Sequence, residues 1–471
     1  MEPNLPRELI ELIVEHLASD RREDCIQALL ACSLADSGLR VTCQRHIFTE
    51  AQMRTIPFQK RNPPSDNASC YRKTALFVKA LVGNPPLASY VRRLDYEVII
   101  IPDTNDEDLA ETLSAMKMMT QVVDLRLGNG HGWDGNIGEG QHPSRWKEAM
   151  RDFIRGSGLK YLSLRGITFP PNYLPTSLRT LDLEGSSLGF EGDRLKGGPR
   201  HRQIELETLW CNDIESLLYF DIYLEEGGQA IRLSKIKNLS LWAHWHVPER
   251  WARLLNQTES IQYLRITVHR RVDDSRAEGV PLEGFVQSPL EHVHQASYST
   301  ITHLKLDIHG SLVPDKPIIR PYTGVLNEGL TRLDALERLE VDMVLEGRYD
   351  LEPMHFNPGE WRSLPLVLQK YGVLPKLGWL SVRVETKLFD PRLRCHPEEP
   401  PLTDEEIAEI ELEFLKKEAH AEMLVEVMAE RTYPRADFQL LLDLRPELDL
   451  SFVTAVTLGN RVWHRIASEL R

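Results

Sequence analysis

The hexapeptide LKYLSL at residues 159–164 decides the expected fold, and it recurs as LRTLDL at residues 178–183. Both copies have an apolar residue at the first position, leucine at the fourth and an apolar residue at the sixth. Alternating apolar and polar residues are typical of a β-strand that buries one face. We therefore expect short strands at these positions, each turning the same face toward a core.

The same pattern, apolar-x-x-Leu-x-apolar, recurs with small variations along the middle of the chain. Its fourth-position leucines are Leu94, Leu125, Leu162, Leu181, Leu209, Leu239, Leu264, Leu304, Leu339 and Leu380. Between them, segments such as residues 146–154 and 248–255 have the apolar periodicity of helices. A repeated strand and helix indicates stacked units whose parallel strands lie side by side. Unrelated strands in an ordinary α/β domain are the alternative, against which the constant leucine argues.

These units resemble leucine-rich repeats. Their spacing is irregular, with 19 residues from Leu162 to Leu181 and 41 from Leu339 to Leu380, whereas repeats of this family span about 20–29 residues. Ile167, Ser186 and Ile214 stand where the family places an asparagine that hydrogen-bonds the turn backbone. The resemblance implies a degenerate leucine-rich-repeat solenoid with long loops over residues 91–396.

The N-terminal residues read as a pair of helices. Pro6 suits the first turn of a helix, and Leu9, Ile13 and Leu17 fall on one face of it. After a polar stretch, residues 26–48 resume a helical apolar pattern. Two helices this short cannot build a core alone, so we expect them to dock onto another surface.

This N-terminal segment resembles the F-box, the module that joins a substrate receptor to the Skp-type adaptor of a cullin–RING ubiquitin ligase. The resemblance rests on LPREL at residues 5–9, ACSL at residues 31–34 and RHIF at residues 45–48, and the last two are most similar to fungal F-box proteins. Leu39 replaces a tryptophan that is common in the family, and the loop between the helices is longer than usual. The resemblance implies adaptor contacts at Leu5, Pro6, Leu9, Ile13, Leu17, Leu30 and Leu34.

The strands of such repeats form an extended surface suited to binding another protein. Aromatic and arginine side chains are favoured anchors at protein interfaces. The candidates for recognition of a protein substrate are Arg126, Tyr161, Arg179, Trp210, Trp242, Tyr263 and Trp379.

The C-terminal part of the chain is strongly acidic. Residues 398–430 contain twelve acidic residues and two lysines, and the whole chain has a formal net charge of -14. Such a balance disfavours nucleic acid as a partner. Thr403 and Glu406 form a capping box, so we expect a helix after it. Residues 397–471 are predicted to be an acidic helical cap on the last repeat; a free coiled coil or an acidic site for a basic substrate are the alternatives.

Enzyme motifs are missing from the sequence. It contains no Gly-x-Ser-x-Gly, Walker loop or His-Glu-x-x-His, and its six cysteines form no Cys-x-x-Cys. His292 and His294 have a spacing found in metal sites but lack a third ligand, so packing and loop roles are expected. We predict no enzyme, no cofactor and no metal.

No apolar run reaches the roughly 18 residues that a bilayer requires, and no secretory signal is visible, so a cytoplasmic or nuclear protein without a membrane partner is expected.

The predicted fold is α/β, with an F-box-like helical module at residues 1–50, a connecting helical segment at residues 51–90, the solenoid and the cap. The predicted function is the substrate-recognition subunit of a cullin–RING ligase, with a Skp-type adaptor, a cullin and an unknown protein substrate as partners. The alternative is a leucine-rich-repeat scaffold whose N-terminal helices only cap the solenoid.

Overall fold

The computed structural model describes the chain in segments that fall into two compact units. The first unit is Met1–Leu209 with Leu218–Arg232, and the second is Trp210–Leu217 with Leu233–Arg471. Both contain a parallel β-sheet and helices, which confirms the predicted α/β class. The described residues are 6–19, 23–54, 65–98, 107–129, 144–169, 173–186, 188, 203–212, 216, 220, 231–243, 248–269, 289–312, 329–348, 364, 368–369, 374–389, 435–458 and 461–466.

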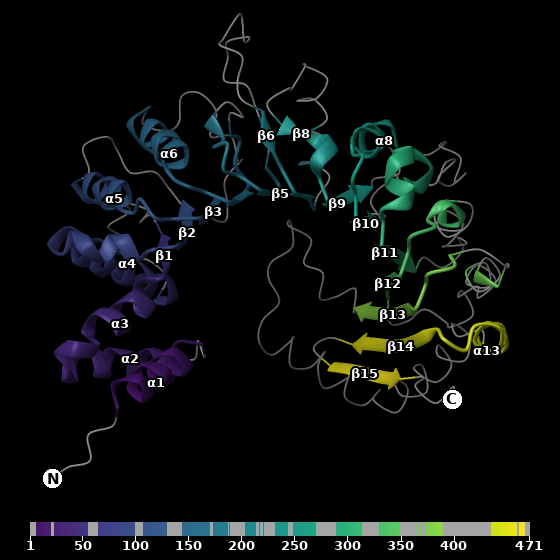
Figure 1. Ribbon diagram of the computed structural model, residues 1–471, viewed down its shortest axis with the longest axis horizontal. Helices are drawn as coiled ribbons and strands as arrows, with labels where there is room; N and C mark the ends of the chain where they lie inside the picture. Colours follow the sequence, from purple (N-terminus) through teal and green to yellow (C-terminus); the bar gives the residue numbers. More distant parts are fainter. Residues whose placement is uncertain are drawn as a thin grey trace, which may run out of the picture. The chain divides into compact units, whose positions relative to one another are not determined.

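The N-terminal module has three helices rather than the predicted pair (Figure 1): α1 (Arg7–Ser19), α2 (Glu23–Ala35) and α3 (Ser37–Phe48). The second predicted segment is broken at Asp36, whose backbone is extended and whose carboxylate accepts a hydrogen bond from the Gly38 N–H at 2.7 Å. An aspartate in this conformation caps a new helix. One buried residue from each helix, Val14, Leu29 and Cys43, forms the core of the module.

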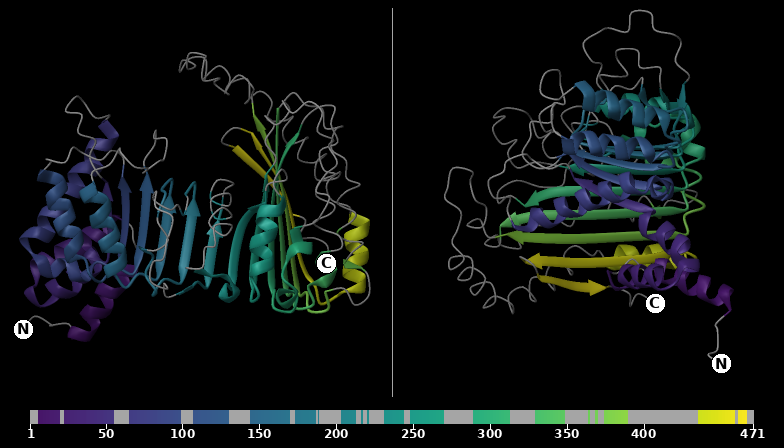
Figure 2. Two further views of the ribbon diagram at one scale, coloured as in Figure 1. Left: turned by 90° about the horizontal axis from the view of Figure 1, so that it is seen from above. Right: turned by 90° about the vertical axis from the view of Figure 1, so that its left-hand side faces the viewer.

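The sheet of the first unit begins immediately after α3. Its strands pair in parallel and in chain order: β1 (Glu50–Arg54), β2 (Arg93–Val98), β3 (Asp124–Asn129), β4 (Tyr161–Arg165) and β5 (Thr180–Glu184). Helices cover one face of these strands (Figure 1, Figure 2): α4 (Ser65–Gly83), α5 (Glu107–Met118) and α6 (Ser144–Gly156), with the short η1 (Pro85–Tyr90) before β2. The unit also contains the small parallel pair of β6 (Ile204–Glu205) and β8 (Ile231–Arg232), and β7 (Thr208–Cys211) spans the division between the units.

The segment predicted as a helical connection, residues 51–90, is therefore helical only in part. It begins within β1, where Ala51 and Met53 are buried on one face. The parallel strands start before residue 91, because the alternating EAQMR sequence of β1 suits a strand.

The second unit repeats the arrangement. Its parallel strands are β9 (Asn238–Ala243), β10 (Tyr263–His269), β11 (His303–Leu312), β12 (Arg338–Arg348), β13 (Trp379–Phe389) and β14 (Asp449–Leu458), and the last strand, β15 (Arg461–Ile466), is antiparallel to β14. The helices α8 (Pro248–Gln257) and α13 (Arg435–Leu444) lie on one face (Figure 1). Short 3₁₀-helices precede several of the strands along the chain: η3 (Leu233–Lys235), η5 (Pro289–His292), η6 (Gln295–Ser299) and η7 (Leu330–Arg332).

The prediction of a wholly helical cap at residues 397–471 is wrong for its last part. After α13 the chain forms β14 and β15, which extend the sheet beyond residue 396. The residues of β14 explain this, because Val453, Thr454 and Val456 are β-branched and favour a strand. The predicted acidic helix at residues 403–430 lies outside the described residues.

The fourth-position leucines of the repeat stand opposite one another in the sheets. In the first unit the register aligns Leu94, Leu125, Leu162 and Leu181, all fully buried. In the second unit the aligned, fully buried leucines are Leu239, Leu264, Leu304, Leu339 and Leu380. The repeat in the sequence is thus a continuous apolar row in each unit.

At most of the strand entrances, one backbone carbonyl ties a strand to the next. The Thr49 carbonyl accepts hydrogen bonds from the N–H groups of both Arg92 and Arg93, at 2.9 and 3.0 Å. The same paired bonds, all between 2.7 and 3.1 Å, recur at the carbonyls of Arg92, Val123, Lys160 and Arg179 in the first unit and of Lys237, Gln262, Thr302 and Glu337 in the second.

The turns after β4 and β5 depend on two glycines and one serine. Gly166 and Gly185 have φ of 61° and 57°, a left-handed conformation that favours glycine. The Ser186 hydroxyl accepts a hydrogen bond from the Ile167 N–H at 3.0 Å and donates one to the Glu184 carbonyl at 3.0 Å. One serine thus satisfies the turn backbone of two neighbouring repeats.

Removing a side chain from the apolar row tests its role. We expect Leu304→Ala to lower the free energy of opening of β10–β12 by about 2–5 kcal/mol, because a fully buried leucine leaves a cavity. Hydrogen exchange of the amides in these strands measures this free energy. Glu337→Ala, at an exposed position just before β12, is the control and should change it little. A loss below about 1 kcal/mol for Leu304→Ala would contradict the packing.

Candidate protein-binding surfaces

Large apolar side chains are exposed along the first two helices. Leu9, Leu12 and Ile13 of α1 are 46%, 58% and 50% exposed, and Leu34 of α2 is 81% exposed. They lie outside the core formed by Val14, Leu29 and Cys43. A concentration of exposed apolar side chains on neighbouring helices marks an interaction surface. We call the exposed residues Leu9, Leu12, Ile13, Leu30 and Leu34 the apolar face.

Most of the predicted adaptor-contact residues belong to this face or adjoin it. Leu9, Ile13, Leu30 and Leu34 are exposed members, and Pro6 is exposed at the start of α1. Leu5 lies outside the described residues.

The other two N-terminal residues singled out from the sequence face inward. Leu17 is half-buried against the core of the module and lines a pocket beside it. Leu39, the residue at which the F-box resemblance expects a tryptophan, also packs against that core. Leu39 is therefore a packing residue of the module.

The strand surface of the first unit carries paired charges. Arg93 bridges two neighbouring strands, with Glu50 at 2.5 Å and Asp124 at 2.7 Å. Arg54 pairs with Glu97 at 2.7 Å. These side chains lie opposite one another because the parallel register places them in rows across β1, β2 and β3.

Two predicted recognition residues meet on this surface. The Arg126 guanidinium lies 5.8 Å from the centre of the Tyr161 ring, and the Tyr161 hydroxyl donates a hydrogen bond to Asp182 at 3.1 Å. Burial, together with the Asp182 charge and hydrogen bond, raises the pKa of Tyr161 to about 12, so the hydroxyl stays protonated. Arg179 is placed elsewhere, in the turn before β5, where it donates to the Glu205 carbonyl at 3.0 Å.

The strand surface of the second unit carries a row of rings and cations. The register aligns Tyr263, His303, Arg338 and Trp379. The Tyr263 ring meets His303 edge-on with 4.8 Å between the centroids, and the Arg338 guanidinium lies 4.4 Å above the Trp379 ring. Tyr263 and Trp379, both predicted from the sequence, are thus the ends of one row, which we call the aromatic row.

Sequence reasoning missed the two central members, His303 and Arg338. The signal that could have found them is their place directly before the fourth-position leucine in consecutive repeats. The two remaining predicted residues, Trp210 on β7 and Trp242 on β9, are half-buried and lie outside the row.

A cluster of charges on the same strands accompanies the aromatic row. The Lys305 ammonium is 2.7 Å from Asp342, 3.5 Å from Glu340 and 3.7 Å from Asp307. Burial alone would lower the pKa of Lys305, but the Asp342 hydrogen bond and the three carboxylates outweigh it and raise the pKa. Arg265 also pairs with Asp307. Arg338, 3.8 Å from Glu340, is the third cation, so three cations balance three carboxylates.

His303 connects the charge cluster to the row. Its Nε2 lies 2.9 Å from a Glu340 carboxylate oxygen. Burial lowers the pKa of His303 below its ordinary value despite that carboxylate, so the ring is neutral at pH 7 and donates its N–H to Glu340.

The histidines near α8 have packing and turn roles, as the sequence indicated. His292 meets the Trp251 ring edge-on, with 5.3 Å between the centroids. His294 accepts a hydrogen bond from the Ala296 N–H at 3.2 Å and caps η6.

Comparison of the sequence with known proteins finds no matching family model and no matching curated protein. Within the described residues, no helix combines the length and the apolar character needed to cross a bilayer. The functional interpretation therefore depends on the surfaces of the chain itself.

We expect Lys305→Met to destabilise the second unit by about 1–3 kcal/mol, because it leaves one buried and two half-buried carboxylates without their shared cation. Denaturant unfolding compares the variant with the unchanged protein. Arg383→Gln is the control: it removes a more exposed cation, paired with Glu385 at 3.2 Å, and should cost less than about 1 kcal/mol. Equal effects of the two substitutions would contradict a special role for Lys305.

The lowered pKa of His303 predicts a pH dependence. The unfolded chain binds this proton more readily, so the stabilising contribution is complete above pH 6.5 and is lost as the pH falls through the folded-state pKa. We expect acidification from neutral pH to lower the thermal midpoint of the unchanged protein more than that of His303→Gln. Melting curves of both proteins at matched pH values measure this difference. Parallel declines would show that His303 does not contribute.

Proposed function

We propose that this chain is the substrate-recognition subunit of a cullin–RING ubiquitin ligase. The N-terminal module, as an F-box, docks onto a Skp-type adaptor, and the strand surfaces of the repeats bind a target protein. The observation that carries the proposal is the apolar face, which includes four residues that the F-box resemblance assigns to the adaptor.

The energetics of the apolar face support a partner there. Full burial of one leucine or isoleucine contributes about 1.5–3 kcal/mol relative to leaving it exposed. Five such side chains, each 37–81% exposed, offer several kcal/mol to a partner that covers them. These residues do not belong to the core of the module, which Val14, Leu29 and Cys43 form.

The parallel strands in chain order support a leucine-rich-repeat solenoid as the receptor arm. Each leucine aligns with the next, and a shared carbonyl joins successive strands. Stacked repeats of this kind contact mainly their neighbours and leave a long strand surface free for a protein ligand. In the second unit, the aromatic row offers tyrosine, tryptophan and arginine, the residues most often found as interface anchors.

The second candidate function is a repeat scaffold whose helices only cap the sheet. One observation favours it, namely that α3 continues directly into the first strand. The Phe48 ring stacks on Phe77 of α4 with 6.0 Å between the centroids, and the Thr49 carbonyl accepts bonds from Arg92 and Arg93. This packing protects the edge of the sheet. It leaves the exposed apolar face unexplained, which is why we favour the receptor.

The double substitution Leu9→Asp and Ile13→Asp tests the receptor function. We expect it to abolish co-purification of the full chain with a co-expressed Skp-type adaptor, because two charges would be buried at the interface. Both side chains are about half exposed in the free chain, so the fold should persist, and circular dichroism checks this. Leu76→Asp, which changes a 59% exposed leucine of α4 outside the apolar face, is the control and should leave the complex intact.

A complex that survives the double substitution, or one that never forms with the unchanged chain, would refute adaptor docking through this face. Deletion of residues 1–48 then distinguishes the scaffold. A capping role predicts that the deletion lowers the thermal stability of the first sheet, whereas a pure docking module predicts loss of the adaptor with the sheet intact.

A further inference from the structure

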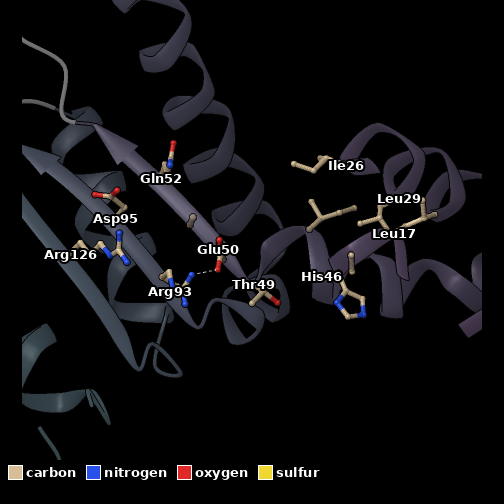
Figure 3. A pocket seen from close by; sticks show the side chains of 13 residues that line it. Leu17, Ile26, Leu29, His46, Thr49, Glu50, Gln52, Arg93, Asp95 and Arg126 are labelled. Carbon is tan, nitrogen blue, oxygen red and sulfur yellow. Dashed lines mark hydrogen bonds and ion pairs between the residues drawn. The ribbon is translucent and has the colours of Figure 1, made fainter. Parts of the chain in front are cut away.

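A pocket with a volume of ≈ 740 Å³ lies between the N-terminal module and the first strands of the sheet. One wall is apolar and comes mainly from the helices, with Leu17, Ile26 and Leu29 (Figure 3). The opposite wall comes from β1, β2 and β3 and is polar. Its labelled members are Glu50, Gln52, Arg93, Asp95 and Arg126 (Figure 3). The volume falls within the range of about 300–1,000 Å³ found for small-molecule sites.

Most of the charge on the polar wall is already engaged. Arg93 is held by Glu50 and Asp124 on the two neighbouring strands, at 2.5 and 2.7 Å. The two carboxylates share that one guanidinium, so the trio keeps one negative charge. Arg93 and Glu50 therefore serve as a fixed frame and have little left to offer a ligand.

Arg126 and Asp95 are the remaining charged side chains labelled on the polar wall. They are direct neighbours in the register of β2 and β3. Neither forms an ion pair with any residue in the described part of the chain, and the Arg126 Nε is buried without a hydrogen-bond partner. The Tyr161 ring, 5.8 Å from the Arg126 guanidinium, supports it from beside the pocket. One positive and one negative group thus line the pocket side by side, opposite an apolar wall.

We propose that this pocket binds a small zwitterion with an apolar body, that is, an apolar amino acid or a short apolar peptide. The Arg126 guanidinium donates hydrogen bonds to the ligand carboxylate, since its planar fork matches that group. The Asp95 carboxylate accepts hydrogen bonds from the ligand ammonium. The apolar side chain lies against Leu17, Ile26 and Leu29.

The charge arrangement favours a zwitterion over a simple acid or amine. An acid without an ammonium would place its carboxylate beside Asp95 with no cation to balance the second negative charge. An amine without a carboxylate would leave the Arg126 guanidinium unpaired in a half-enclosed site. A partly desolvated charge without a partner costs free energy, so each single-charge ligand loses affinity.

Isothermal titration of the full chain tests the site with L-leucine and L-leucyl-L-leucine as probes. Two analogues of leucine carry one charge each, 4-methylpentanoate without the ammonium and 3-methylbutylamine without the carboxylate. We expect at least one zwitterion to bind. Each analogue should bind at least about tenfold more weakly, because it lacks one charge-assisted hydrogen bond. The two zwitterionic probes distinguish a free amino acid from a peptide as the source of the ligand.

Variants of the polar wall assign the roles. Arg126→Gln and Asp95→Asn should each weaken the zwitterion about tenfold. Arg165→Gln is the matched control, because Arg165 lies on β4 outside the pocket and pairs with Glu184 at 3.1 Å, and it should leave binding unchanged. Circular dichroism shows that each variant keeps its fold.

Three results would overturn the proposal: no binding of either zwitterion, an affinity for 4-methylpentanoate or 3-methylbutylamine equal to that for L-leucine, or full binding by both folded wall variants. None of these measurements requires the adaptor or a target protein. The experiments therefore test the pocket independently of the receptor function.

Discussion

The arrangement of the parallel strands in both units depends on one repeated backbone interaction, a carbonyl that accepts two N–H groups at the entrance of the next strand. From Thr49 to Arg179 and again from Lys237 to Glu337, this bond sets where each strand begins relative to the last. A register shift of one residue would turn every buried leucine to the exposed face. The bond therefore also places the polar residues, because the side chains before and after each leucine must project from the opposite face. The rows formed by Tyr263, His303, Arg338 and Trp379 are a consequence of this geometry.

This dependence explains what the sequence alone could and could not predict. The strands around Leu162 and Leu181 were recognisable because alternation is a local property. The apolar face was recognisable in the same way, from the spacing of Leu9 and Ile13. The Lys305–Asp342 contact joins side chains 37 residues apart, so it becomes visible only when the strands are aligned. The helix break at Asp36 was missed because the apolar pattern of residues 26–48 continues through it, and one capping carboxylate decided the break. Strand β14 was missed because its neighbour along the chain is an acidic stretch with helical periodicity.

The balance of charge on the strands bears on how a target would be recognised. Lys305, Arg265 and Arg338 face Asp307, Glu340 and Asp342, so this cluster of three cations and three carboxylates carries little net charge. The net charge of -14 belongs largely to residues 398–430, away from these strands in the sequence. A target that docks on the aromatic row would therefore gain affinity mainly by covering Tyr263 and Trp379. The neighbouring ion pairs would set specificity, because a partner that disturbs them bears the desolvation free energy without gaining a compensating interaction.

The N-terminal module contributes residues to both proposed binding sites, the adaptor-binding face and the pocket. Its helices α1 and α2 expose Leu9, Ile13 and Leu34 to a docking partner and turn Leu17 and Leu29 toward the core and the pocket. A ligand against Leu17 and Leu29 would touch the same two helices that the proposed adaptor would contact. Contact alone does not couple two sites, because a ligand shifts an equilibrium only by its difference in affinity between two states. Coupling requires that α1 and α2 pack differently on Cys43 when the pocket is filled. Were that so, linkage would make the effect reciprocal, and the adaptor would change the affinity for the zwitterion by the same factor.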